Sequence, residues 1–156
     1  MSLVPRHSFI RLLSTCGGIG FLPFAPGTFG TLPGVLLAWI LSPLPWFIQL
    51  STCLALLALA VPIASAAEKI FQRHDPPCVV IDEAAAFPLA VFLLPPTWQT
   101  FLAAFILFRL IDIFKPWPCS HLQRLPSGYG IVADDTAAAL LACLFVHLLR
   151  LFSQWQ

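Results

Sequence analysis

The chain alternates between long apolar stretches and short segments rich in polar residues, glycine or proline. The apolar stretches cover residues 35–47, 48–67, 79–95, 98–114 and 136–152. A helix needs about 20 apolar residues to cross a membrane, and several of these stretches are shorter. Kinks are predicted at four prolines, Pro43, Pro45, Pro62 and Pro88. The pattern therefore predicts about four to five short or kinked membrane helices, some of them tilted or re-entrant.

Two regions outside these stretches have a distinct pattern. Residues 1–16 mix basic and apolar side chains, which predicts a short N-terminal helix at the membrane interface. Six of the eight glycines lie within 17–34, and the other two are Gly128 and Gly130. Because glycine allows positive φ angles and close approach of backbones, we expect two specialised loops at these places.

Composition supports a membrane protein. The chain has 156 residues, which fits a single domain spanning 1–156. Hydrophobic residues make up 59% and charged residues only 10%, and the mean hydropathy is +0.89. A soluble domain has about 25% charged residues because it must keep a wettable surface. We therefore expect a compact, multi-helix integral membrane protein; the alternative is a soluble helical protein with an unusually apolar surface or a large oligomeric interface.

Several classes of function are disfavoured. The net charge is +1 and there is no basic stripe, so no nucleic-acid partner is expected. No GxSxG or Cys/His signature points to acyl transfer. The five cysteines form no CxxC pair, and their odd number and wide spacing disfavour a zinc site or a disulfide scaffold. They are Cys16, Cys53, Cys78, Cys119 and Cys143.

The acidic residues gather beside apolar stretches. Of seven acidic residues, five form three such clusters: Asp82 with Glu83, Asp112, and Asp134 with Asp135. Acidic groups at membrane depth are costly, so they are candidates for function. The remaining two, Glu68 and Asp75, lie in a polar loop, and we interpret them as ordinary solvated charges.

Helix capping is the structural alternative for two of these clusters. Asp82–Glu83 and Asp134–Asp135 each precede an apolar run, where carboxylates can cap a helix and complement its dipole. Capping does not explain Asp112, which lies at the C-terminal end of its stretch and needs a cationic partner. Arg109 and Lys115 lie three residues before and after it on the same helical face, so an intrahelical salt bridge is the alternative there.

Taken together, the clusters favour metal-assisted phosphoryl chemistry at a membrane surface. Carboxylate oxygens suit hard divalent cations such as Mg²⁺, and Arg109 and Lys115 suit a phosphate. The segment APGTFGT, with Gly27 and Thr28, has the composition of a phosphate-binding loop but lacks the GxxxxGK[ST] form. Two rivals remain open: a small membrane ion transporter or channel, and a scaffold subunit.

Four segments carry a resemblance to a known family. They are GFLPFAPGTFGTLPG (20–34), VIDEAAAFPLA (80–90), FRLIDIFKPWP (108–118) and GYGIVADDTAAA (128–139). In their order and spacing they resemble the phosphatidylglycerophosphatase A family of bacterial membrane phosphatases. After Asp82–Glu83 the family often has a bulky residue and then a glycine. This chain has AAAFP instead, so the local helix geometry is expected to differ, with a kink at Pro88.

The resemblance implies an all-α fold and Mg²⁺-dependent removal of the terminal phosphate from phosphatidylglycerophosphate, giving phosphatidylglycerol. It implies that the acidic clusters are catalytic and hold the metal, and that the phosphate is bound by four further residues. The metal-site residues are Asp82, Glu83, Asp112, Asp134 and Asp135; the phosphate-binding residues are Arg109, Lys115, Gly27 and Thr28. A related alternative is a phosphatase for another lipid, such as phosphatidic acid.

The resemblance also implies a bacterial inner (cytoplasmic) membrane location. A multi-pass topology with a cytoplasmic N-terminus places all three acidic clusters on the cytoplasmic side, where a phospholipid headgroup would reach them. The expected partners are therefore the membrane and a phospholipid substrate. Five short helices are few to enclose a site, which leaves room for a homodimer.

Overall fold

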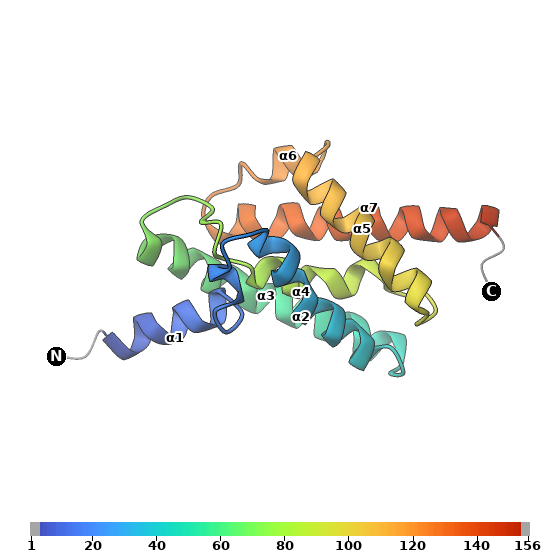
Figure 1. Cartoon of the computed structure of the whole chain (residues 1–156), viewed down its shortest axis with the longest axis horizontal. Coiled ribbons are helices and arrows are strands. Elements are labelled where there is room, and N and C mark those ends of the chain that lie inside the picture. Colours follow the sequence, from blue (N-terminus) through green and yellow to red (C-terminus); the bar gives the residue numbers. More distant parts are fainter. Residues whose placement is uncertain (1–3, 154–156) are drawn as a thin grey trace.

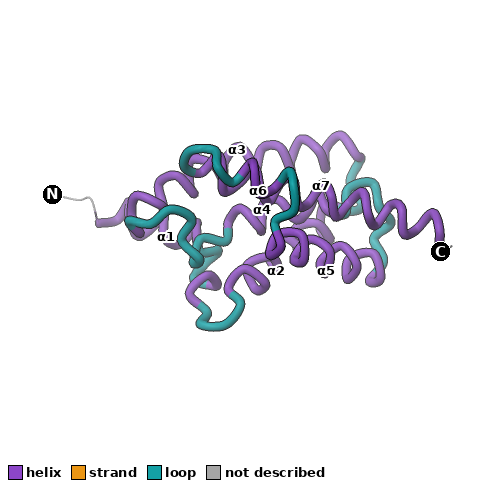
Figure 2. The backbone as a smooth tube through the Cα atoms, turned by 90° about the horizontal axis from the view of Figure 1, so that it is seen from above, coloured by secondary structure: helices purple, strands orange, loops and turns teal. Residues whose placement is uncertain are grey.

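The chain is described by a computed structural model that places residues 4–153 (Figure 1). The described part consists of helices joined by loops and turns, with no strand (Figure 2), so the all-α prediction is confirmed. In chain order the elements are α1 (Val4–Ser14), the 3₁₀ helix η1 (Ile19–Phe21), α2 (Pro26–Leu41), α3 (Trp46–Phe71), α4 (Ile81–Ala90), α5 (Trp98–Phe114), α6 (Cys119–Leu122) and α7 (Gly128–Ser153). Helix α1 matches the predicted N-terminal helix over 1–16, of which residues 1–3 lie outside the described part.

Helix α4 is the centre of the molecule. It packs against α2, α3, α5 and α7, and nine of its ten residues, Asp82 to Ala90, are buried. Four of those nine are alanines, and such small side chains let neighbouring helices approach closely. Phe87 fills the space toward α5, where its ring contacts Phe101, Phe105 and Phe108 with centroid separations of 5.9–6.5 Å. A helix held on all sides gives the two carboxylates in its first turn a fixed position.

The first glycine-rich segment is only partly a loop. Gly27, Gly30 and Gly34 lie inside α2, which begins at Pro26, so the predicted loop over 17–34 is wrong for its second half. These glycines face α4: a Cβ at Gly30 would come within 2.7 Å of the Glu83 carboxylate, and one at Gly34 within 2.6 Å of the Ala84 carbonyl oxygen. Their role is close helix packing rather than turning the chain, and the sequence does not separate these two uses of glycine.

The second pair of glycines also belongs to a helix. Helix α7 begins at Gly128, eight residues before the predicted stretch 136–152. The backbone N–H of Gly128 donates to Ser65 Oγ of α3 at 3.0 Å, and a Cβ there would come within 2.6 Å of the same oxygen. The glycine therefore permits α3 and α7 to cross closely at this end.

Within residues 4–153, two helices are long and apolar enough to cross a membrane. They are α3 and α7, with hydropathies of 2.1 and 1.8 over their most apolar windows. The stretch 98–114 forms α5 with the predicted bounds. By contrast, the stretch predicted over 79–95 forms only the ten-residue α4, which is too short to span a bilayer. The sequence of this stretch is apolar because α4 is buried in protein on every side.

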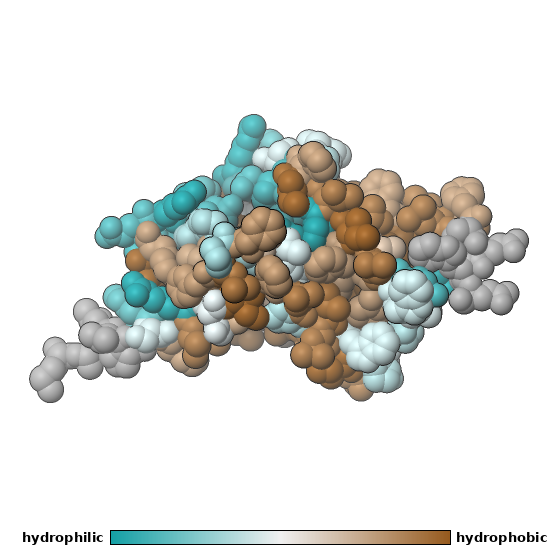
Figure 3. Space-filling view, in the orientation of Figure 1, coloured by the Kyte–Doolittle hydropathy of each residue, from teal (hydrophilic) through white to brown (hydrophobic). Residues whose placement is uncertain are grey.

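Apolar side chains also cover much of the outer surface. Exposed large apolar residues recur along α2, α3, α5 and α7; on α2 they are Phe29, Leu32, Leu36, Trp39 and Ile40. Hydrophilic residues gather toward the upper left of Figure 3, the end that carries α6 and the loop between α3 and α4. The surface is thus divided into a broad apolar face and one polar end.

Candidate functional site

One cleft collects all the residues that the sequence singled out. Its volume is about 420 Å³. Its lining includes all nine predicted site residues, namely Gly27, Thr28, Asp82, Glu83, Arg109, Asp112, Lys115, Asp134 and Asp135. These residues come from α2, α4, α7 and the C-terminal end of α5, so segments more than 100 residues apart in the chain meet there.

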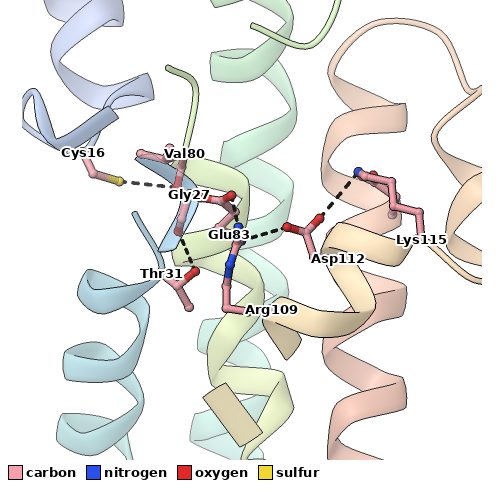
Figure 4. A network of polar contacts seen from close by, with 9 residues as sticks. Cys16, Gly27, Thr31, Val80, Glu83, Arg109, Asp112 and Lys115 are labelled. Atoms are coloured by element: carbon pink, nitrogen blue, oxygen red, sulfur yellow. Dashed lines mark hydrogen bonds and ion pairs between the residues drawn. The ribbon is translucent and has the colours of Figure 1, made fainter. Parts of the chain in front are cut away.

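Arg109 joins two of the acidic clusters. Its Nη1 donates to Glu83 Oε1 at 3.0 Å and to Asp112 Oδ2 at 2.8 Å (Figure 4). The side chain is 13% exposed and each carboxylate 12% exposed. Charge-assisted hydrogen bonds of low exposure are strong and directional. The predicted partner for Asp112 is therefore present, and the same guanidinium reaches across to α4.

Lys115 makes the second connection, between α5 and α7. Its Nζ donates to Asp134 and lies 3.5 Å from Asp112 Oδ1. Burial by itself lowers the pKa of Lys115, but the hydrogen bond and charge of Asp134, together with the charge of Asp112, outweigh it and leave the pKa well above its ordinary value. Lys115 is therefore a permanent cation in the cleft. The salt bridges extend beyond one helix, so the purely intrahelical alternative is wrong.

Three buried carboxylate oxygens have no hydrogen-bond partner among the described residues. They are Asp82 Oδ1, Glu83 Oε2 and Asp135 Oδ2. In addition, Asp112, Asp134 and Asp135 each offer a carboxylate oxygen within 4.8 Å of the others. Buried charged atoms without a partner are costly, so a positively charged ligand is the natural complement. Oxygen donors converging in this way fit a hard divalent cation.

The capping alternative is wrong for one acidic pair. Asp134 and Asp135 lie six and seven residues after Gly128, within the second turn of α7, where no free backbone N–H group remains to be capped. Both are buried, with 3% and 2% exposure. Asp82 and Glu83 do lie in the first turn of α4, where they complement the helix dipole, but the N-cap is Val80 and makes no side-chain cap hydrogen bond. Both residues nevertheless line the cleft, and each has a buried carboxylate oxygen with no hydrogen-bond partner in the described part of the chain.

The N-terminus of α2 forms another wall of the cleft. Its N-cap, Ala25, has φ 45° and no side-chain oxygen to bond the first turn, so the N–H groups of Gly27 and Thr28 have no helical partner. A Cβ at Gly27 would collide with Glu83 Oε1 and lie 2.8 Å from Arg109 Nη2. Helix N-termini bind anions through such N–H groups and the helix dipole. The predicted phosphate loop is thus a helix N-terminus with the same chemical capacity.

Two further charged residues line the cleft, Arg73 and Asp75. The interpretation of Asp75 as an ordinary solvated charge is wrong. Its Oδ2 accepts a hydrogen bond from Gln123 Nε2 at 3.1 Å, and its N–H donates to Glu68 Oε1 at 3.2 Å. The sequence held only a weak indication that Asp75 lines the cleft: it lies in a short charged loop, seven residues before Asp82.

Comparison with known proteins identifies relatives over most of the chain. The family model for phosphatidylglycerophosphatase A matches residues 12–150. A protein of that name in Escherichia coli (strain K12) is 27% identical, with 96% of this chain and 94% of the relative covered. One in Haemophilus influenzae is 34% identical, with 90% and 88% covered.

A third relative bears a different name. In Bacteroides thetaiotaomicron, a protein provisionally named phosphatidylinositol-3-phosphatase is 33% identical, with 93% of this chain and 96% of the relative covered. No solved structure matches the chain. The family match extends over all four segments that line or support the cleft, and on this basis the chain belongs to the phosphatidylglycerophosphatase A family.

Proposed function

We propose that this protein is a Mg²⁺-dependent phosphatase that converts phosphatidylglycerophosphate to phosphatidylglycerol in bacterial phospholipid biosynthesis. The observation that carries the proposal is the cleft in which five buried or nearly buried carboxylates meet two cations and a helix N-terminus. The family membership supports hydrolysis of a phosphate monoester on a lipid.

Charge balance supports a metal ion. The cleft is lined by six carboxylates and three cations, the carboxylates including Asp75 and the cations including Arg73. When these carboxylates are ionised, the cleft carries an excess of negative charge that would repel a phosphate dianion. The residues that would hold Mg²⁺ are Asp82, Glu83, Asp112, Asp134 and Asp135. When bound, Mg²⁺ would polarise a phosphoryl oxygen and offset the charge of the carboxylates.

The chain's own groups would bind and orient the phosphate. Lys115 and Arg109 present charged N–H donors, and the free N–H groups of Gly27 and Thr28 point the positive end of the α2 dipole at the same space. Because Arg109 and Lys115 are already held by carboxylates, their positions need little reorganisation when the phosphate arrives.

The reaction breaks the bond between phosphorus and the glycerol oxygen. That oxygen takes a proton and leaves as the hydroxyl of phosphatidylglycerol, and the phosphoryl group ends as inorganic phosphate. The nucleophile is either water, deprotonated by a carboxylate of the cleft, or one of the aspartates, which would form a phospho-aspartate that water then hydrolyses. Trapping a phospho-aspartate after an acid quench would decide for the second route.

The site would work at a membrane surface. The apolar face along α2, α3, α5 and α7 suits lipid, and the polar end with the cleft suits the headgroup level. In this proposal the protein is a multi-pass protein of the bacterial inner membrane with the cleft on the cytoplasmic side. A homodimer would cover part of the apolar face.

The direct test is phosphate release by the detergent-purified protein. Phosphatidylglycerophosphate and phosphatidic acid are offered in parallel, with Mg²⁺ and then with EDTA. We expect Mg²⁺-dependent release that favours the first lipid. A folded sample that releases no phosphate from either lipid would contradict the proposal, and release that persists in EDTA would contradict the metal.

A third lipid, phosphatidylinositol 3-phosphate, belongs in the same assay. The Bacteroides relative, 33% identical over nearly its whole length, is provisionally named phosphatidylinositol-3-phosphatase. Faster phosphate release from that lipid than from phosphatidylglycerophosphate would support a lipid phosphatase but change the headgroup that we propose as its preferred substrate.

A further inference from the structure

The three cations of the cleft are not equivalent. Arg109 and Lys115 are both committed to carboxylates, at Glu83, Asp112 and Asp134. Arg73 makes no ion pair with any residue of the described part of the chain, and its side chain is exposed where it lines the cleft. One full positive charge is therefore left available at this site, and it stands on a different element from the other two.

Arg73 stands on a well-held backbone. It follows Gln72, the left-handed C-cap of α3 with φ 51°, and its own N–H donates to the Glu68 carbonyl at 3.3 Å. Two residues further on, Asp75 ties the same loop to Gln123 on the segment between α6 and α7. The arginine therefore projects from a loop anchored on both sides, so less freedom is lost on binding an anion.

Resting on the proposed function, we infer that Arg73 binds the phosphodiester of the lipid substrate and so selects lipids with two phosphates. Phosphatidylglycerophosphate carries a phosphomonoester and, one glycerol unit away, a phosphodiester; phosphatidic acid carries one phosphate. The monoester occupies the end of the cleft at Arg109, Lys115 and the α2 N-terminus. The second phosphate then meets the cation that has no carboxylate of its own.

The neighbouring charges are consistent with this role. Asp75 is the other charged cleft residue on the loop, and its Oδ2 is occupied by the Gln123 amide. The nearby His74 is paired with Glu68 at 2.6 Å and does not line the cleft. An arginine also suits a phosphodiester better than a lysine does, because its planar group can donate two parallel hydrogen bonds.

The test measures selectivity rather than activity alone. Initial rates are measured with Mg²⁺ in nonionic mixed micelles containing either phosphatidylglycerophosphate or phosphatidic acid. We expect Arg73→Gln to lower kcat/KM for the first lipid about tenfold, mainly through KM, because one charge-assisted contact is lost. The rate on phosphatidic acid should change less than about twofold, and Arg73→Lys should lie between Gln and the wild type.

Arg124→Gln is the matched control. Arg124 is an exposed arginine on the segment after α6, at the same polar end, and does not line the cleft. It should leave both rates unchanged. An equal loss on both lipids in Arg73→Gln, or the same loss in Arg124→Gln, would show general attraction to anionic surfaces and overturn the inference.

The wild-type rates separate this inference from the proposed function. If the wild type is active and Arg73→Gln has the same lipid preference, only the proposed role of Arg73 is contradicted. A folded wild type that is inactive on both lipids removes the proposed function, and this inference with it.

Discussion

The charged cleft and an apolar groove of the same size lie on opposite faces of the first turns of α4. Each has a volume of about 420 Å³. The cleft is lined by Asp82 and Glu83, while the groove is lined by Ile81, Ala84 and Ala85 and by apolar residues of α1, α2 and α3. Helical periodicity alone assigns these five residues to two faces.

Because the cleft and the groove have the same volume but different linings, cavity volume alone does not identify the candidate active site. The groove offers a single polar side chain, Cys16, whose thiol donates to the Val80 carbonyl at 3.7 Å. Residues that line the cleft carry three buried carboxylate oxygens for which residues 4–153 supply no hydrogen-bond partner. Folding tolerates such costly atoms only when something is gained elsewhere, which is typical of functional sites. The following four predictions test whether chemistry resides in the cleft and only packing in the groove.

The largest effect is expected for Asp135→Asn. The substitution keeps the shape of a side chain that is 2% exposed but removes its charge. We expect turnover of phosphatidylglycerophosphate to fall on the order of a thousandfold because metal and transition-state stabilisation are lost together. The melting temperature in detergent should hardly change. Glu68→Gln is the control, since Glu68 lies outside the cleft lining and a glutamine oxygen can still accept from the Asp75 N–H; normal turnover in Asp135→Asn would remove Asp135 from the metal site.

Gly27→Ala should come next. The new Cβ would collide with Glu83 Oε1 and crowd Arg109, so both groups must move. A displacement of about 1 Å can cost on the order of a hundredfold in rate. Phosphate release and thermal unfolding are measured on the same preparation. Gly17→Ala is the comparison: its φ is +74° and nothing lies within 4 Å, so it should cost stability, about 1 kcal/mol, and spare the rate. An equal rate loss in both variants would contradict the role of Gly27.

Lys115→Ala should have a smaller effect, mainly on substrate binding. The variant loses a cation near the phosphate, and we expect KM to rise about tenfold with a lesser change in kcat. Steady-state kinetics with phosphatidylglycerophosphate give both constants. Lys69→Ala removes an exposed lysine outside the cleft as a control. An unchanged KM would show that Lys115 only neutralises Asp112 and Asp134.

The smallest effect on rate is expected in the apolar groove. Leu56 on α3 lines it and packs against the core while only partly buried. Leu56→Ala should cost about 1–2 kcal/mol of unfolding free energy and change the rate less than about twofold. Thermal unfolding and phosphate release are compared. A large loss of rate with unchanged stability would show that the groove contributes to the reaction, and would contradict the assignment of the groove to packing alone.

The accuracy of the helix bounds predicted from the sequence differs between the apolar stretches. Stretch 98–114 has its helix bounds right because Thr97 caps the helix, accepting from the Thr100 N–H at 3.3 Å, and no glycine or proline interrupts the run. Stretches 79–95 and 136–152 have wrong bounds. An apolar run signals burial without telling whether lipid or protein provides it, and a glycine pair looks the same in a loop and at a helix crossing.

The candidate site was predictable in its membership but not in its connections. Composition and spacing picked out nine of the residues that line the cleft, but not Arg73 or Asp75. That Arg109 bridges Glu83 and Asp112 could not be read from the chain, since 26 residues separate Arg109 from Glu83. The sequence also did not predict that Asp75 lines the cleft, because the sequence of a short loop does not show which part of the protein a charged side chain packs against.

The sequence by itself determined that the chain is helical and apolar, that its few acids are concentrated at three places, and that cations lie beside one of them. Those properties are local, being set by residue type and short-range spacing. Only the tertiary structure decided that the three places become one cleft, which cation of that cleft has no ion pair with the described residues, and which face of α4 carries charge. These depend on the packing of α2, α5 and α7 around α4, where contacts between distant residues are fixed by shape and close approach.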